Sequence, residues 1–511
     1  MLQQFVWFRV YNTWTEILQA DQYILKILSK ESSYPTNAAE LLKWQRFNNN
    51  SLEVGWDGWI RLLRTPKTKY PYFPTGLVPR LTRICKKLGY EVHIEDRRQR
   101  PQEGFPEHSK NGVIVDRDYQ LEAVKSAVKL GRGVLDMPPR SGKTRTMIEI
   151  HRQFSLPTLW IAPTVRIVDQ TAKVITEFFG KNYVANVGDK LGLEVLKNSR
   201  IVICTASAAI KLSEEIYATR EMLIVDEWHH GAAKTYTKDV FPKCDHIYFR
   251  FGMTGTHFRS GEDALAMHGL LSDVIYKVST PFLLQRGFLV PTKVAFIPMP
   301  AYPKVRGVGK TFASGHGKHG IHVHKGRNQL VTHAAFYLNK MGRKVLILVG
   351  TKAQGYMIQK MLSQFILNDT GNSGYEFQPV EFLSTDVPRH KQARILDSYL
   401  SNQEVQVLIG TSLLGEGVDL PYVDALVYAR GEKAEVSLRQ NWFRVCTAIE
   451  GKRNAIIVDF ADRHNRNLLK HSHDRLDAYY TEPIFSTTIL QDVNGFVPWI
   501  EKLGQESAPK H

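Results

Sequence analysis

One segment of the chain has the residue types and spacing of a phosphate-binding loop. It reads LDMPPRSGKT over residues 135–144, follows an apolar run and continues into the helical pattern TRTMIEIHRQF. A loop at a helix N-terminus points backbone N–H groups at phosphate oxygens, so we expect a nucleotide cradle made of Pro139, Arg140, Ser141 and Gly142. Lys143 would reach the terminal phosphates, and Thr144 would offer its hydroxyl to Mg²⁺. Met137 stands where the strict pattern has its first glycine, which leaves open a plain basic turn in which Ser141 caps the helix.

Two adjacent carboxylates end another apolar run, MLIVDEWHH, which places Asp226 and Glu227 directly after four apolar residues. Ligands of α/β proteins bind outside the carboxyl ends of the strands. One carboxylate there suits Mg²⁺, and the other polarises an attacking water. Combined with the loop at 135–144, the pair predicts a site for ATP and Mg²⁺. Lys143, Asp226 and Glu227 are then its catalytic residues, with Thr144 and Asp226 on the metal.

These residues need a parallel sheet to position them. From about residue 113 onward, short apolar runs bounded by turn residues alternate with amphipathic segments; the runs are GVLDM, LWIAP, IVICT, MLIVDE, VLILVG, VQVLIG and ALVYA. This alternation indicates parallel sheets covered by helices, so the expected class is α/β. The Gly-, His- and Lys-rich residues 307–326 are typical of a connector between two such units.

Residues 1–108 have a different texture and are expected to form a small α+β domain with helical periodicity over Trp14–Leu28 and a charged hinge at its end. Its aromatic residues either stack on a nucleic acid or form an ordinary small core, and both interpretations stay open; they are Trp56, Trp59, Tyr70, Tyr72 and Phe73. Four cations between them, here called the N-terminal basic cluster, are expected to contact phosphates: Arg61, Arg64, Lys67 and Lys69.

Positive charge is concentrated in two stretches. The chain has 67 Lys and Arg against 50 Asp and Glu, a net charge of +17. Eight Lys or Arg and no acid lie between Arg61 and Tyr90, and fourteen and no acid lie between Val274 and Asn368. Folded surfaces usually mix both signs, so contact with a nucleic-acid backbone is favoured over a solvated face.

The remaining composition excludes several classes of protein. With 43% hydrophobic and 23% charged residues, the chain is neither disordered nor fibrous. Its four cysteines lie far apart without a CxxC pair, which argues against a zinc ribbon or a disulfide framework. No secretion signal and no long uncharged apolar run is recognised, so we expect a soluble cytoplasmic protein without a membrane partner.

The order of these motifs resembles that of the superfamily 2 helicases of the DEAD/DEAH type. VDRDYQLEAV is similar to the Q-motif, which implies that Arg117 and Gln120 contact the nucleotide base. WIAPTVRIVDQ is similar to motif Ia, DEWH at 226–229 to the DEAH box and MTGT at 253–256 to motif III. The resemblance also implies that Thr164 and Thr205 contact the nucleic-acid backbone.

The second half of the chain continues the resemblance. VLILVGTKAQ is similar to motif IV and VLIGTSLLGEGVDLP to motif V. This implies that Thr351 and Thr411 contact a strand backbone and that Gly417 and Asp419 face the nucleotide. The resemblance spans about residues 115–460 and implies two RecA-like domains.

Motif VI departs from the family pattern QxxGRxxR. Gln440 and Arg444 match it, but Phe443 replaces the glycine and Thr447 replaces the final arginine. That arginine normally stabilises charge on the transferring phosphoryl group, so its loss puts the rate of hydrolysis in question. Arg444 remains as the candidate finger, with Gln440 as a further catalytic residue, and an Arg444 that only pairs with an acid of its own domain stays an alternative.

Within the superfamily, the arrangement is similar to the XPB and phage UvsW type of double-stranded DNA translocase, because a small domain with WDGWIRLLR and GYEVHIEDRR precedes the motor. The expected organisation is a DNA-binding accessory domain at 1–108, an ATP-binding domain at 109–288, a helicase C-terminal domain at 289–475 and an extension at 476–511. His316, His319, His322 and His324 have no nearby Cys, Asp or Glu, so a basic loop is favoured over a metal site.

The resulting hypothesis is an ATP- and Mg²⁺-dependent DNA helicase or translocase. It would act on duplex or branched DNA in recombination, repair or replication restart, and a chain that is little more than motor plus one small domain suits a phage or bacterial enzyme. Two alternatives stay open: an RNA helicase, and a nucleotide-gated DNA clamp with weak turnover, which the loss of arginine at Thr447 motivates. Polarity and oligomeric state are not predicted.

Overall fold

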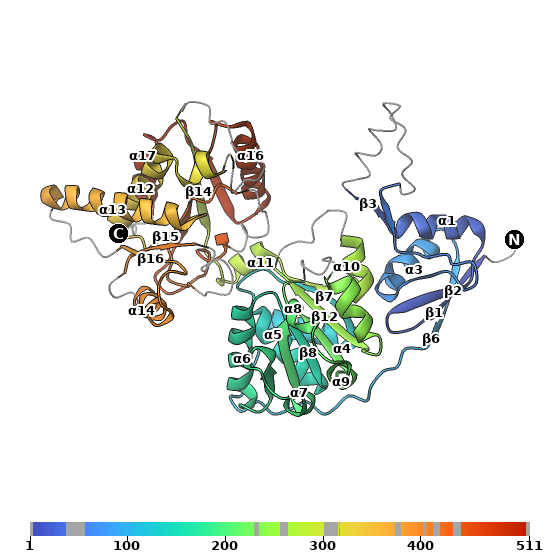
Figure 1. Cartoon of the computed structure of the whole chain (residues 1–511). Helices are drawn as coiled ribbons and strands as arrows, with labels where there is room; N and C mark the ends of the chain where they lie inside the picture. The colour runs from blue at the N-terminus through green and yellow to red at the C-terminus, as the bar shows by residue number, and fades with distance from the viewer. Residues whose placement is uncertain are drawn as a thin grey trace. The chain divides into compact units, whose positions relative to one another are not determined.

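The chain forms two compact units, Met1–Val278 and Ser279–His511 (Figure 1). A computed structural model describes residues 4–36, 57–228, 235–255, 264–300, 315, 317–373, 380–401, 405–411, 420–432 and 441–506. Within these residues, no helix has the length and apolar character needed to cross a membrane.

The first unit begins with an N-terminal module built on a four-stranded sheet of order β5-β2-β1-β6. Its strands are β1 (Phe5–Val10), β2 (Trp14–Gln19), β5 (Tyr72–Pro74) and β6 (Glu91–Asp96). The helices α1 (Gln22–Glu31) and α3 (Val78–Lys87) lie over one face (Figure 1). Val6, Phe8 and Val10 alternate with outward side chains on β1 and form the core with this layer. The short 3₁₀ turn η1 (Thr75–Leu77) precedes α3, and β3 (Ser33–Pro35) pairs with β4 (Trp59–Arg61).

The helix expected over Trp14–Leu28 is wrong in its first part, because Trp14–Gln19 is a strand. Thr15 and Ile17 are buried and alternate with more exposed neighbours, so a period of two replaces the helical period. The helix starts only at Gln22, where the Asp21 carboxylate accepts a hydrogen bond from the Ile24 N–H.

The expected hinge after the N-terminal module is instead fixed along the first motor domain. The Gly104 N–H donates to the Phe154 carbonyl at 3.1 Å, and the Lys110 N–H donates to the Phe178 carbonyl at 2.7 Å. Arg100 lies over the Tyr248 ring at 5.6 Å. Because backbone groups of the segment that follows the module are hydrogen-bonded to the first motor domain, this segment is an ordered connection and not a free linker.

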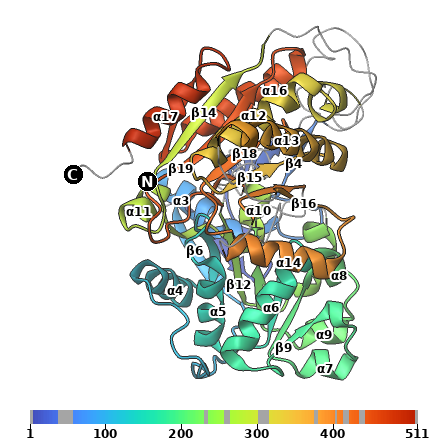
Figure 2. The same cartoon turned by 90° about the vertical axis from the view of Figure 1, so that its left-hand side faces the viewer.

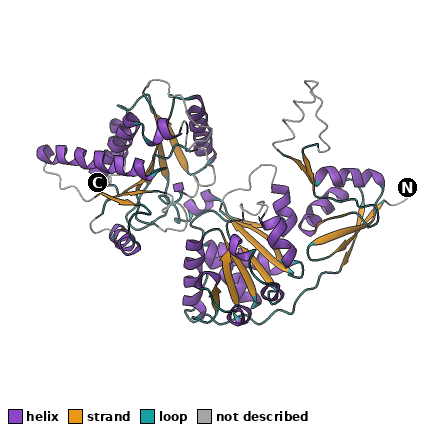
Figure 3. Cartoon of the chain, viewed as in Figure 1, coloured by secondary structure: helices purple, strands orange, loops and turns teal. Residues whose placement is uncertain are grey.

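The first motor domain is a seven-stranded parallel sheet of order β13-β7-β12-β11-β8-β10-β9, with helices on both faces (Figure 3). Its strands are β7 (Arg132–Asp136), β8 (Thr158–Ala162), β9 (Val184–Asn186), β10 (Ile201–Thr205), β11 (Met222–Val225), β12 (Phe249–Thr254) and β13 (Val274–Lys277). Its helices are α4 (Asp118–Leu130), α5 (Lys143–Phe154), α6 (Val165–Phe179), α7 (Leu193–Asn198), α8 (Ala206–Ala209), α9 (Glu214–Ala218) and α10 (Ala264–Leu271), with shorter turns η2 (Val187–Asp189), η4 (Thr235–Val240) and η5 (Phe241–Cys244).

The second unit carries another seven-stranded parallel sheet, of order β16-β17-β15-β18-β19-β14-β20, and α12 and α13 pack side by side on it (Figure 2). Its strands are β14 (Thr292–Pro298), β15 (Val345–Leu348), β16 (Val380–Leu383), β17 (Val407–Gly410), β18 (Ala425–Tyr428), β19 (Ala455–Ala461) and β20 (Phe485–Ile489). Its helices are α11 (Thr280–Gln285), η6 (Lys318–His322), α12 (Lys325–Lys340), α13 (Lys352–Ser373), α14 (Arg389–Leu400), α16 (Arg466–Thr481) and α17 (Phe496–Glu506). The two parallel sheets and the small N-terminal module confirm the expected α/β class with two RecA-like domains.

Part of the acid-free span Val274–Asn368 holds the second sheet together rather than facing outward. Arg327 and Asp462 are both fully buried, and the Arg327 Nε donates to the Asp462 carboxylate at 2.7 Å. Lys340 pairs with Asp369 at 3.0 Å. Arg327 and Lys340 are therefore neutralised by acids that lie later in the sequence, so the charge of this span is not all available to a polyanion.

Candidate nucleotide and nucleic-acid site

The expected phosphate loop joins β7 to α5, and its backbone takes the conformations that such a loop needs. Gly142 has a φ of 82°, and a Cβ there would lie 2.0 Å from the Gln120 amide nitrogen, so only glycine fits. Arg140 has a φ of 72°, which is strained for a residue with a Cβ. Position 137 does not need the glycine of the strict pattern. The Met137 N–H donates to the Thr254 carbonyl at 2.9 Å, so this residue continues the hydrogen-bond ladder between β7 and β12.

Side chains from the segment before α4 hold this loop in place. The Arg117 guanidinium donates to the Arg140 carbonyl at 3.1 Å and to the Tyr119 hydroxyl at 2.7 Å. The Tyr119 hydroxyl and the Gln120 amide both donate to the Ser141 carbonyl, at 2.9 and 2.8 Å. Burial raises the pKa of the Tyr119 phenol, which therefore stays a donor at neutral pH. Arg117 and Gln120, predicted near the base, thus lie against the phosphate loop.

Lys143 and Glu227 are brought into direct contact although they lie far apart in the sequence. The Lys143 Nζ donates to the Glu227 Oε1 at 2.8 Å, and the two side chains are only 14% and 13% exposed. Gly255 makes room for the pair, because a Cβ at Gly255 would lie 2.5 Å from the Lys143 Nζ. Lys143, which we expect to bind the terminal phosphate, is therefore paired here with Glu227, the carboxylate that we expect to polarise the attacking water.

The two residues predicted for Mg²⁺ lie at the same edge of the sheet. Asp226 follows β11 and is buried, its N–H donating to the Ile161 carbonyl at 2.8 Å, while its Oδ1 accepts the Glu227 N–H at 2.8 Å. Glu227 itself has a φ of 46°. Thr144 is half-buried in the first turn of α5, beside Lys143. A carboxylate and a hydroxyl are oxygen donors of the kind that Mg²⁺ prefers, so these residues fit the metal.

Two of the threonines assigned to nucleic acid cap helices at the same edge. Thr164 follows β8, and its hydroxyl oxygen accepts the Ile167 N–H at 3.4 Å. Thr205 ends β10, and its hydroxyl oxygen accepts the Ala208 N–H at 3.3 Å. A hydroxyl that accepts in a cap can still donate its own proton, and the Thr205 hydroxyl also shares a hydrogen bond with the Ser207 hydroxyl at 3.1 Å. Along the sheet order, the nucleotide residues follow β7, β12 and β11, and these threonines follow the next strands, β8 and β10.

In the second unit, the carboxyl ends of three adjacent strands carry the corresponding residues. Thr411 follows β17 and is buried, and Thr351 follows β15 and accepts the Gln354 N–H on its hydroxyl oxygen at 3.2 Å. Arg430 follows β18, the next strand, and pairs with Glu432 at 3.1 Å. Arg430 was not singled out in the sequence analysis, although it directly follows the apolar run ALVYA.

Arg444 is 5% exposed, and its N–H donates to the Asn441 carbonyl at 3.4 Å. Thr447, which replaces the usual arginine, pairs with Leu289 as an isolated β-bridge, and the flanking Ala448 N–H donates to the Phe288 carbonyl at 3.2 Å. The backbone at position 447 is therefore held by these contacts with residues 288 and 289. With threonine at this position, motif VI has no second guanidinium beside that of Arg444.

Several predicted residues lie outside the described residues: Gly417, Asp419, Gln440, His229, Thr256 and His316. In the part of the chain that the structure describes, no group of His, Cys, Asp and Glu is arranged to hold a metal ion. His324 instead caps α12 by accepting the Arg327 N–H at 3.0 Å.

The N-terminal basic cluster lies on the surface of the module. Arg61, Arg64, Lys67 and Lys69 are exposed, and Arg61 is bonded to the Asp57 carboxylate. The neighbouring aromatic residues divide between the two interpretations, because Phe73 is fully buried in the module core whereas Trp59 and Tyr70 are exposed. Trp56 lies in a part of the chain that the structure does not describe.

Two domain families match the chain over these motifs. The family described as type III restriction enzyme, res subunit, matches residues 114–259, and the helicase conserved C-terminal domain matches residues 327–446. The chain belongs to the superfamily 2 helicases. The DNA 3'-5' translocase XPB2 of Sulfurisphaera tokodaii is 27% identical over 165 residues, which cover 32% of this chain and 36% of the relative. The chain spans between 36% and 64% of the length of the curated relatives that it matches.

Solved structures show the same fold at low identity. UvsW of bacteriophage T4 is 17% identical, with 96% of this chain and 100% of that chain covered and a TM-score of 0.45. The ATP-dependent type ISP restriction-modification enzyme LlaBIII, solved bound to DNA, is 14% identical, with 84% of this chain and 35% of that chain covered and a TM-score of 0.56. The similarity to XPB expected from the sequence is thus found.

Proposed function

We propose that this helicase is an ATP- and Mg²⁺-dependent DNA translocase that moves along duplex or branched DNA. The observation that carries the proposal is the convergence of Lys143, Glu227, Asp226 and Gly255 at one edge of a parallel sheet whose next strands end in Thr164 and Thr205. One edge thereby places nucleotide chemistry beside hydroxyl donors suited to a phosphate backbone.

The residues present fit ATP. The Gln120 Oε1 is buried and has no hydrogen-bond partner among the described residues, which suits an adenine amino group. Gly142 is the residue that precedes α5, so the free N–H groups at the N-terminus of this helix lie next to the loop, where they suit phosphate oxygens. When bound through Thr144 and Asp226, Mg²⁺ would neutralise charge on the phosphates.

The proposed roles follow from these contacts. Lys143 moves from Glu227 to the terminal phosphate, which releases the Glu227 carboxylate to orient and polarise the attacking water. Arg444 stabilises the charge that develops on the transferring phosphoryl group when the motor domains close. From the family pattern, we assign Gln440 to the same step, and Gly417 and Asp419 to contact with the nucleotide. Closure changes the grip of Thr164 and Thr205 relative to Thr351 and Thr411 along one strand.

DNA is favoured over RNA as the partner by the similarity to the DNA translocase XPB2. The exposed N-terminal basic cluster suits the phosphate backbone of either nucleic acid. We assign residues 1–108 to DNA binding, 109–288 and 289–475 to the motor, and 476–511 to an extension; recombination, repair or replication restart in the cytoplasm of a bacterium or phage-infected cell is the proposed setting.

A second candidate, a nucleotide-gated DNA clamp, is favoured by Thr447, because a threonine stands where the family pattern has the finger arginine. The test is ATP turnover of the full chain with single-stranded, duplex, forked and four-way DNA beside matched RNAs. A translocase shows turnover stimulated by duplex or branched DNA; stimulation by RNA alone would contradict the choice of DNA. For a clamp, DNA binding would depend on nucleotide while turnover stayed near its DNA-free rate.

A further inference from the structure

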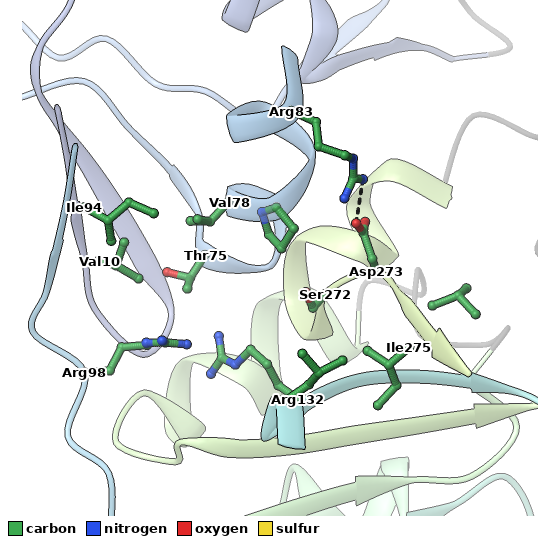
Figure 4. A pocket seen from close by; sticks show the side chains of 13 residues that line it. Val10, Thr75, Val78, Arg83, Ile94, Arg98, Arg132, Ser272, Asp273 and Ile275 are labelled. Carbon is green, nitrogen blue, oxygen red and sulfur yellow. Dashed lines mark hydrogen bonds and ion pairs between the residues drawn. The ribbon is translucent and has the colours of Figure 1, made fainter. Parts of the chain in front are cut away.

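A cavity of about 450 Å³ lies where the N-terminal module meets β7 and β13 of the first motor domain (Figure 4). Apolar side chains form most of its wall, with Val10, Val78 and Ile94 from the module and Leu130 and Ile275 from the motor. Its volume is in the range of pockets that take small organic molecules, about 300–1,000 Å³. The cavity is separate from the phosphate loop, because it includes the first residue of β7 whereas the loop follows the last.

Three arginines line this cavity, and one of them, Arg132, forms no ion pair within the described residues. Arg83 donates to the Asp273 carboxylate at 2.6 Å, and Arg98 pairs with Asp96 at 2.6 Å. Arg132 is 6% exposed and donates from Nη2 to the Tyr248 carbonyl at 3.0 Å. Its Nε and Nη1 are buried and, in the part of the chain that the structure describes, have no hydrogen-bond partner. Figure 4 shows the Arg98 and Arg132 guanidinium groups directed toward one another across the cavity.

A second buried cation, Arg250, makes the burial of the positive charge on Arg132 more unfavourable. Arg250 on β12 lies directly opposite Arg132 on β7 in the strand register. It donates to neutral groups, the Cys244 carbonyl at 2.8 Å and the Thr13 hydroxyl at 2.6 Å. Burial and the neighbouring charges of Arg250 and Arg98 lower the pKa of Arg132, and the Asp96 carboxylate offsets only part of this effect. Like charges opposite each other on adjacent strands repel, and a buried charge needs a counter-charge, so an anion would stabilise this part of the fold.

We propose that the cavity binds a small organic anion, a carboxylate or phosphate ester on a compact apolar body, with its oxyanion on the unpaired N–H groups of Arg132. Arginine recognises both oxyanions, and the apolar wall favours an alkyl or aryl body over a hydroxylated one. Because the wall comes from both the N-terminal module and the motor, the bound anion also ties these two parts together.

The test is calorimetric titration of the full-length protein with phenylacetate, and with phenyl phosphate in the presence of saturating ADP and Mg²⁺ to occupy the phosphate loop. Arg132→Met removes the charge. Arg80→Met is the matched control, since Arg80 lies on α3, pairs with Glu31 and does not line the cavity. We expect one saturable site in the native protein and the control, and affinity at least about thirtyfold weaker in Arg132→Met. Benzyl alcohol, which has the body without the charge, should not bind measurably.

Thermal unfolding keeps the proposal testable if Arg132→Met alters stability. Without probe, the variant should unfold at a Tm equal to or above that of the native protein, because an uncompensated buried charge is gone. Phenylacetate should raise the Tm of the native protein and leave that of the variant unchanged. Absence of saturable binding at millimolar probe, or equal probe effects in both proteins, would overturn the proposal. Displacement of bound probe by a duplex oligonucleotide would overturn the assignment to a free small molecule.

Discussion

The contact between Lys143 and Glu227 makes a prediction with an unusual sign: Glu227→Gln should bind nucleotide more tightly than the native protein while losing turnover. In the native protein, the Lys143 Nζ must leave a carboxylate at 2.8 Å before it reaches a phosphate. Glutamine has nearly the same shape and tolerates the φ of 46° no worse than glutamate, so the loop keeps its geometry. The substitution removes a competitor for Lys143 and the group that polarises water.

The expected size follows from the burial of the pair. Hydrogen bonds between charged groups contribute about 1.5–3 kcal/mol, roughly twice as much as neutral ones. With both side chains only 14% and 13% exposed, exchanging the carboxylate for an amide should remove about 1 kcal/mol of the native contact. At 1.4 kcal/mol per tenfold, this corresponds to a nucleotide affinity about fivefold higher.

The assay is equilibrium binding of a fluorescent ADP analogue with Mg²⁺, beside steady-state ATP hydrolysis. The matched control is the same substitution in a Lys143→Ala background, where it should no longer raise affinity, because the competing contact is already absent. Equal or weaker binding by Glu227→Gln, or ordinary turnover, would refute the roles given to the pair.

Three further predictions concern other parts of the molecule. Arg444→Ala should lower turnover by about 10³-fold with a much smaller change in ATP affinity, whereas Thr447→Arg should speed hydrolysis or leave it unchanged; a fully active Arg444→Ala would remove the finger role. Within the N-terminal basic cluster, neutralising Arg64, Lys67 and Lys69 together should flatten the plot of log duplex-DNA affinity against log salt by up to about 2.7, and neutralising Lys125 and Lys129 on α4 should not; an unchanged slope would place the cluster on a solvated face. His151 is buried between the Thr158 and Tyr183 hydroxyls, each at 2.8 Å, and burial lowers its pKa to about 3. The unfolded histidine takes up a proton below about pH 6.5 and the folded one does not, so the free energy of unfolding should fall as the pH drops from there toward 5, with a slope that approaches about 1.4 kcal/mol per pH unit. Denaturant titrations should show a weaker pH dependence for His151→Gln, and equal dependence would contradict the buried neutral ring.

The seven apolar runs found in the sequence are strands β7, β8, β10, β11, β15, β17 and β18. They were predictable because central strands of a parallel sheet are buried on both faces and read as continuous apolar segments. Strand β2 was not predictable in this way, because its sequence WTEILQ mixes polar and apolar residues at spacings that also fit a helix. The roles of the threonines and of Arg444 stay predictions from the family pattern.

Contacts made through the sheet order could not be read from the chain. Lys143 meets Glu227 beside Gly255 because β12, which comes later in the sequence than β11, is inserted between β7 and β11. The environment of Arg132 could not be predicted either. A basic residue at the start of a strand is expected to be exposed, but in the fold β12 places Arg250 opposite Arg132 and the N-terminal module covers it.

The central claim, ATP-driven movement along duplex DNA, is tested most directly by displacement of a triplex-forming third strand from a DNA duplex, because this requires translocation rather than binding. The full-length protein with ATP and Mg²⁺ should release the third strand, and Glu227→Gln should bind the same duplex without releasing it. Release that is equally fast without ATP or with Glu227→Gln, or no release by a protein that binds the duplex and hydrolyses ATP, would contradict the account.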